Sequence, residues 1–138
     1  MEIADALAYA RSRDHGVLVT LKGDGRPQLS NVNHAVGDDD VVRVSITADR
    51  AKYRNLVRDP RVSLHVTAED FWSYVVLEGD ADLSPVAERP DDATVAELVD
   101  LYRAVQGEHP DWDDYRAAMV RDRRVVLRLR PTHAYGMA

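Results

Sequence analysis

Short segments with an alternating apolar pattern, separated by tight turns, make up most of this 138-residue sequence. Apolar residues occupy every second position in 41–47 and 62–67, which is typical of strands with one buried face. Short connections such as Lys22-Gly23-Asp24-Gly25 join antiparallel neighbours, so we predict a mainly β (α+β) fold, a small antiparallel barrel with peripheral helices. The predicted strands are 16–21, 27–36, 41–47, 62–67, 71–83 and 124–129, with a bulge or bend at Gly79.

Helical spacing of apolar residues marks the remaining elements. Residues 2–10 form a small amphipathic helix in this interpretation. A second helix, capped by Asp91 and Asp92, runs to about Gln106, where Gly107 ends it. A further short helix begins at Asp111. We expect these helices to lie at the periphery of the barrel.

Length and composition exclude several classes of protein. The length suits one domain, residues 1–138, and the longest apolar stretch is too short for a membrane span. The N-terminus lacks the pattern of a signal peptide, so we expect a cytoplasmic protein. A net charge of −6 argues against general nucleic-acid binding. The absence of cysteine excludes disulfides and thiol catalysis, and the five histidines lack metal-ligand spacing, so we expect no metal site.

The segment 45–61 has the features of an anion site. Asp49 is a plausible N-cap for a short helix, and Pro60 prevents that helix from continuing. Within it, Tyr53, Leu56 and Val57 form an apolar arc, and Arg50 and Lys52 lie near its two edges, at the first turn. Free N–H groups, the helix dipole and two flanking cations together favour binding of a phosphate. The alternative is an exposed basic helix face neutralised by nearby carboxylates.

The segment 27–36 is unusually polar for a strand. Asn31 lies on one of its faces, and Gln28 and Ser30 lie on the other. This pattern suits a strand that lines a polar cavity, although an edge strand would also explain it. The sequence contains no nucleophile with an accompanying base, and we identify no catalytic residue. If the protein is an enzyme, its reactive chemistry belongs to a bound cofactor.

Two motifs then identify a family resemblance. G-x-P-x-x-S-x-V begins at Gly25, and R-x-K-x-x-N-L-x-R-D-P begins at Arg50. With these motifs, nearly the whole chain resembles the flavin/deazaflavin oxidoreductases of the pyridoxamine-5′-phosphate-oxidase-like superfamily. The resemblance is closest to the actinobacterial group that uses coenzyme F420. It implies an antiparallel FMN-binding split β-barrel of about six to seven strands.

The resemblance also implies a homodimer, with each cofactor in a groove between the chains. Arg50 and Lys52 would hold the cofactor phosphate, while Gln28, Asn31 and Ser45 would line its ring and side chain. Trp72, Ser73 and Tyr74 would close the groove from the partner chain. The expected cofactor-binding set also includes Ser30, Ala51, Arg54 and Asn55. Arg54, Arg58 or Arg61 could face the acidic tail of the deazaflavin.

The function implied by the resemblance is F420-dependent hydride transfer to a small electrophilic acceptor, conjugated or quinone-like. An acceptor pocket could come from His34, Phe71, Trp72 and Tyr102. The alternatives are an FMN-binding oxidoreductase of the same fold and a non-catalytic F420- or flavin-binding protein. Oxidation of pyridoxamine phosphate is not expected, because the sequence ends in T-H-A-Y-G-M-A without the arginine and aromatic residues that bind that substrate.

Overall fold

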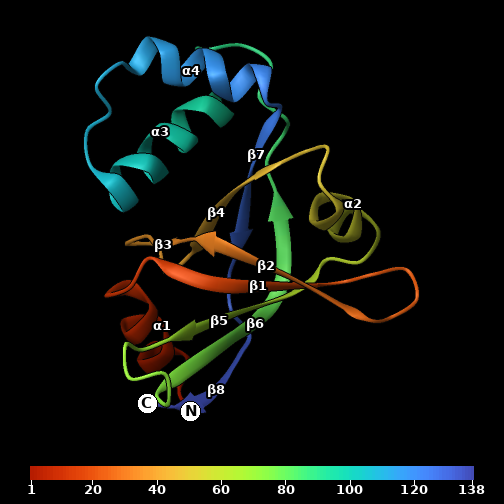
Figure 1. The fold of residues 1–138 in the computed structure, drawn as a ribbon, viewed down its shortest axis with the longest axis vertical. Coiled ribbons are helices and arrows are strands. Elements are labelled where there is room, and N and C mark those ends of the chain that lie inside the picture. The colour runs from red at the N-terminus through yellow and green to blue at the C-terminus, as the bar shows by residue number, and fades with distance from the viewer.

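A curled antiparallel sheet with helices around it forms the fold in the computed structural model, which describes residues 1–138 (Figure 1). Seven strands follow one another in the order β2-β1-β5-β6-β7-β4-β3, and β8 pairs with β6. The strands are β1 (His15–Leu21), β2 (Pro27–Asn33), β3 (Ala35–Val36), β4 (Val42–Thr47), β5 (Arg61–Thr67), β6 (Tyr74–Leu83), β7 (Arg124–Leu129) and β8 (His133–Met137). The helices are α1 (Ile3–Arg11), α2 (Ala51–Arg58), α3 (Ala93–Gln106) and α4 (Trp112–Arg121). None of them is long and apolar enough to cross a membrane.

The sheet curls because its two ends belong to one stretch of chain. β2 and β3 lie at opposite ends of the strand order, yet only His34 separates them in sequence. The ring of His34 is buried, with Nε2 2.9 Å from the carbonyl oxygen of Ala10 in α1. Its backbone N–H donates to Asp14, so the chain leaves the ladder at this residue and the predicted strand 27–36 is divided. The predicted antiparallel split barrel is confirmed, with eight strands because β3 is separate and the C-terminal segment forms β8.

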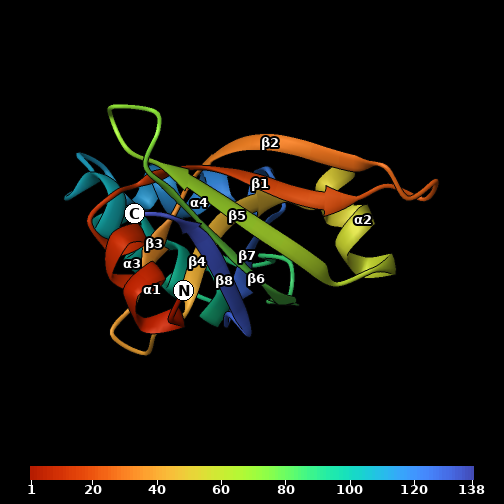
Figure 2. The ribbon, with the colours of Figure 1, turned by 90° about the horizontal axis from the view of Figure 1, so that it is seen from below.

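The core lies inside this curl. Leu18 of β1, Leu64 of β5 and Leu77 of β6 are fully buried and belong to one cluster with inward residues of β4 and β7. The small side chains Ala6 and Ala10 let α1 approach that cluster closely. In Figure 2, α1 lies at one end of the curled sheet and α2 at the other.

The α3–α4 pair packs on the outer face of β7. Val126 of β7 belongs to a second apolar cluster with Leu98 of α3 and Met119 of α4. Asp92 caps α3 by accepting from the N–H of Val95, at 2.8 Å, as predicted. Asp111 caps α4 in the same way, accepting from Asp114 at 3.1 Å. Both helices therefore begin at residues that the sequence indicated.

Local details of α2 differ from the sequence prediction. The N-cap of α2 is Arg50 and has no side-chain cap bond, so the predicted cap at Asp49 is wrong. Asp49 instead offers its backbone carbonyl to Nη1 of Arg54, at 2.8 Å. Leu56 is buried and Tyr53 packs on the core, but Val57 is 65% exposed, because the helix buries a narrower face than predicted.

Two predicted features of β6 also need correction. The strand begins at Tyr74, because residues 70–73 form a turn in which Asp70 accepts from the N–H groups of Trp72 and Ser73. Phe71 has a positive φ of 73° within that turn. Gly79 pairs in regular register with Val62, so there is no bulge, and from Ala81 onward the strand pairs with β7 instead of β5. A Cβ at Gly79 would lie 2.9 Å from the carbonyl oxygen of Arg130, which explains glycine at this close approach.

A half-buried ion-pair network fastens α3 to the sheet. Glu97 accepts from Arg128 at 2.6 Å and from Arg43 at 2.8 Å, and these two arginines are cross-strand partners on β4 and β7. The hydrogen bond from Arg128 is the largest influence that holds the pKa of Glu97 below its ordinary value. The ionised carboxylate therefore stabilises the folded state.

We predict that Glu97→Gln lowers the free energy of unfolding at pH 7 by about 1–2 kcal/mol. Because the folded-state pKa of Glu97 is depressed, its contribution is present above the ordinary value of 4.5 and is lost as the pH falls through the folded-state pKa. Urea unfolding at pH 7 and pH 4 measures the free energy of unfolding of both proteins. The difference between variant and wild type should be smaller at pH 4 than at pH 7. Glu88→Gln, at an exposed residue, is the matched control. An equal gap at both pH values would contradict this account.

Candidate functional site

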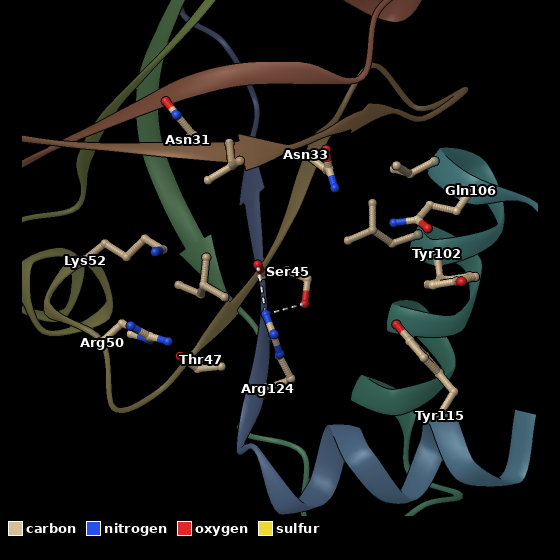
Figure 3. A pocket seen from close by; sticks show the side chains of 14 residues that line it. Asn31, Asn33, Ser45, Thr47, Arg50, Lys52, Tyr102, Gln106, Tyr115 and Arg124 are labelled. Carbon is tan, nitrogen blue, oxygen red and sulfur yellow. Dashed lines mark hydrogen bonds between the residues drawn. The ribbon is translucent and has the colours of Figure 1, made fainter. Parts of the chain in front are cut away.

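A pocket of about 440 Å³ opens between the sheet and the α3–α4 pair (Figure 3). β2 lies along one side of it, β4 and β7 form its floor, and the start of α2 lies at one end. No aspartate or glutamate lines it. The lining residues are Asn31, Val32, Asn33, Ser45, Ile46, Thr47, Arg50, Lys52, Leu101, Tyr102, Val105, Gln106, Tyr115 and Arg124.

The α2 end of the pocket is cationic. Arg50 is the N-cap of α2 and Lys52 lies in its first turn, and Figure 3 shows both side chains directed toward the pocket. Neither forms a salt bridge. Burial, and to a lesser extent the nearby charges of Arg50 and Arg124, hold the pKa of Lys52 below its ordinary value. An anion bound here would relieve this repulsion and would also meet the positive end of the helix dipole.

The floor of the pocket adds a third cation. Arg124 of β7 lies opposite Thr47 of β4, and Nη1 of Arg124 makes only long contacts to Ser45, at 3.4 Å to Oγ and 3.5 Å to the carbonyl oxygen. Sequence reasoning missed Arg124 as a site residue. The concentration of arginines in 121–130 was the available signal, but nothing local indicates which of them faces a pocket.

The side formed by α3 and α4 is apolar and aromatic. Leu101, Tyr102 and Val105 of α3 face the pocket, with Gln106 at the end of that helix. The rings of Tyr102 and Tyr115 lie 5.0 Å apart between centroids. The hydroxyl of Tyr115 donates to the carbonyl oxygen of Leu98 at 3.0 Å, and burial raises the pKa of Tyr115 to about 12. Tyr115 is therefore a neutral structural support at ordinary pH.

The structure brings four of the predicted site residues together at this pocket: Asn31, Ser45, Arg50 and Lys52. Tyr102, expected to help form an acceptor pocket, also lines it, whereas His34 and Phe71 do not. Gln28, Ser30, Ala51, Arg54 and Asn55 lie outside its lining. Asn55 is buried and donates to Gln28 at 2.6 Å and to Thr20 at 3.1 Å, so it joins α2 to β1 and β2.

The predicted groove-closing residues lie elsewhere on the same chain. Trp72 and Ser73 belong to the β5–β6 turn, and Trp72 is 76% exposed. The ring of Tyr74 stacks on His65 with centroids 5.1 Å apart. These side chains do not line the pocket of their own chain.

The arginines expected near an acidic tail have partners within the chain. Arg58 donates to the carbonyl oxygen of Leu21 at 2.6 Å, and Arg61 pairs with Asp59 at 2.8 Å. They border a different hollow, beside the β1–β2 turn. No group of three histidine, aspartate or glutamate side chains forms a potential metal site.

Comparisons with known proteins agree with the fold. A protein-family model described as pyridoxamine 5′-phosphate oxidase matches residues 3–138. Among solved structures, an F420 reductase is 28% identical, with a TM-score of 0.70 over 92% of this chain and 94% of that one. A conserved hypothetical protein from Mycobacterium tuberculosis is 24% identical, with a TM-score of 0.75 over 99% and 84% of the two chains. A haem-binding protein from Mycobacterium smegmatis is 23% identical, with a TM-score of 0.69, and the match covers 99% of this chain and 52% of that one.

We predict that Asn55→Ala lowers the free energy of unfolding by about 1–3 kcal/mol, because it removes buried hydrogen bonds to Gln28 and Thr20. Urea unfolding measures the change. The exposed Asn33→Ala is the matched control and should stay within about 0.5 kcal/mol of wild type. Unchanged stability of Asn55→Ala would contradict the structural role described here.

Proposed function

Because the chain belongs to the pyridoxamine 5′-phosphate oxidase family, we propose that its pocket binds a flavin-type cofactor, the deazaflavin coenzyme F420, for an oxidoreductase reaction. The observation that carries this proposal is the pair Arg50 and Lys52, two cations without carboxylate partners in a pocket without acidic residues. Such a corner fits the phosphate of the cofactor. Asn31 and Ser45 supply neutral hydrogen-bonding groups for its ring and hydroxylated side chain.

Similarity to a solved structure favours the deazaflavin over FMN. The F420 reductase matches at 28% identity over 94% of its length, which supports F420 for this chain. FMN is the second candidate, because the same two cations would hold its phosphate equally well. A protein that binds either cofactor without catalysing a reaction is the third.

When bound, the reduced deazaflavin supplies a hydride that forms a C–H bond at an electrophilic carbon of a conjugated or quinone-like acceptor, while the displaced electron pair takes a proton from solvent. The residues of the chain would bind and orient the two partners and exclude water. The apolar side chains of α3 serve the last role on one side of the pocket. Tyr115 is not the proton donor in this account, since its hydroxyl is bonded to Leu98.

We also propose a homodimer. Leu29 of β2 and Tyr135 and Met137 of β8 are exposed apolar side chains on the outer face of the β2-β1-β5-β6-β8 part of the sheet. Phe71 and Trp72 add exposed rings at the β5–β6 turn. A second copy covering this surface would bury these side chains and could bring Trp72 and Tyr74 to the partner's pocket.

We predict that Arg50→Gln and Lys52→Gln each weaken F420 binding about tenfold to a hundredfold, because each removes a charge-assisted hydrogen bond to the phosphate. Fluorescence quenching during titration with F420, and with FMN in parallel, measures both affinities. Arg121→Gln makes the same charge change at an exposed residue outside the pocket and should bind like wild type. Equal binding by all of these variants would contradict the assignment of the phosphate to α2.

We predict that wild-type protein is a dimer by light scattering coupled to size exclusion and that Leu29→Glu shifts it toward monomer. A carboxylate buried without a partner at the interface would cost several kcal/mol. Val57→Glu is the matched control, since Val57 is equally exposed but lies on α2, away from this face. A wild-type monomer, or dissociation caused equally by both substitutions, would contradict this interface.

A further inference from the structure

Two residues on the floor of the pocket each hold a buried hydrogen-bonding atom without a hydrogen-bond partner. The atoms are Nε of Arg124 and Oγ1 of Thr47, from directly opposite positions of β7 and β4. The whole chain has only four such atoms, and these two residues are the ones that line the pocket. A buried polar group without a partner is costly, so its retention calls for an explanation. A ligand acceptor at this point would supply one.

The charge of Arg124 is uncompensated, unlike that of its neighbours. Three arginines extend from the same face of β4 and β7: Arg43, Arg124 and Arg128. Arg43 pairs with Asp39 and Glu97, and Arg128 pairs with Asp82 and Glu97, all within 3.0 Å. Arg124 has only its long contacts to Ser45. The same sheet face therefore holds one neutralised end, under α3, and one cationic end, in the pocket.

The position of Arg124 separates two halves of the pocket. In Figure 3 its guanidinium group lies between the cationic corner of Arg50 and Lys52 and the aromatic side formed by Tyr102 and Tyr115. On the aromatic side, Tyr102 is held by neighbouring rings, with centroids 5.0 Å from Tyr115 and 5.7 Å from Trp112. Leu101 and Val105 add apolar side chains to the same side of the pocket. Aromatic and apolar side chains of this kind suit a planar organic molecule.

The three cations of the pocket form two separate sites, and each site suits an anion of different charge. Two cations and a helix N-terminus at Arg50 and Lys52 suit a phosphate. One guanidinium, that of Arg124, and one hydroxyl on the paired residue Thr47 suit a single carboxylate, whose planar oxygens match the guanidinium geometry.

We propose that the half of the pocket between Arg124 and α3 is the acceptor subsite, and that it selects planar conjugated acceptors carrying a carboxylate, which Arg124 and Thr47 bind. This inference rests on the proposed function, since the other half is reserved for the cofactor. Arg124 is then a specificity-determining residue: it binds the anionic group of the acceptor and leaves the electrophilic carbon exposed to the cofactor.

The test uses trans-cinnamate and its neutral amide, cinnamamide, as probes. Their binding to the intact protein, with and without saturating oxidised F420, is followed by ligand-observed NMR titration. Wild type should prefer cinnamate about tenfold or more, the effect of a charge-assisted hydrogen bond. Arg124→Gln should abolish that preference through loss of cinnamate affinity, with cinnamamide and F420 affinities unchanged within about twofold. Arg124→Lys should keep part of the preference, and Arg121→Gln all of it.

The outcomes separate this inference from the proposed function. Equal binding of the two probes to wild type would overturn the inference, whatever the variants do. Loss of F420 affinity in Arg124→Gln as large as in Arg50→Gln would also overturn it, because Arg124 would then belong to the phosphate site. If neither F420 nor FMN binds but cinnamate binding still depends on Arg124, the proposed function fails while the carboxylate site stands. Comparing the probes on wild type requires no variant to fold.

Discussion

The break at His34 is the constraint on which the arrangement of this molecule depends. Because β2 and β3 occupy opposite ends of the strand order and only one residue joins them, the sheet must curl. The buried hydrogen bond between His34 and Ala10 fixes that residue against α1. The curl encloses the leucine-rich core on one side of the sheet. It also brings the end of β2, with Asn31 and Asn33, over the face of β4 and β7 that forms the pocket floor.

The distribution of carboxylates then decides what the pocket can bind. The protein has a net charge of −6, yet the pocket between the sheet and the α3–α4 pair is lined without an acidic residue. Glu97, Asp39 and Asp82 neutralise arginines of the same sheet face a short distance away. The cationic pocket is therefore a local arrangement within an acidic protein. That contrast favours a specific anionic ligand over general attraction to polyanions.

Sequence patterns predicted those features that are determined by residues close together in the chain. The strand pattern, the caps Asp92 and Asp111, and the cations at the first turn of α2 were all predictable in this way. The two motifs indicated the family to which the chain belongs. Arg124 was not predictable as a site residue, because it is 79 positions from Ser45, which it meets only through the pairing of β4 with β7. Asn55 is the converse case. Its place in the motif that begins at Arg50 predicted a cofactor-binding role, whereas its hydrogen bonds join α2 to β1 and β2.

A crystal structure of the protein with bound F420 tests the central claim most directly. The account predicts that the phosphate lies at the first turn of α2, bonded to Arg50 and Lys52, with the ring beside Asn31 and Ser45. A cofactor whose phosphate lies elsewhere, such as the hollow bordered by Arg58 and Arg61, would contradict it.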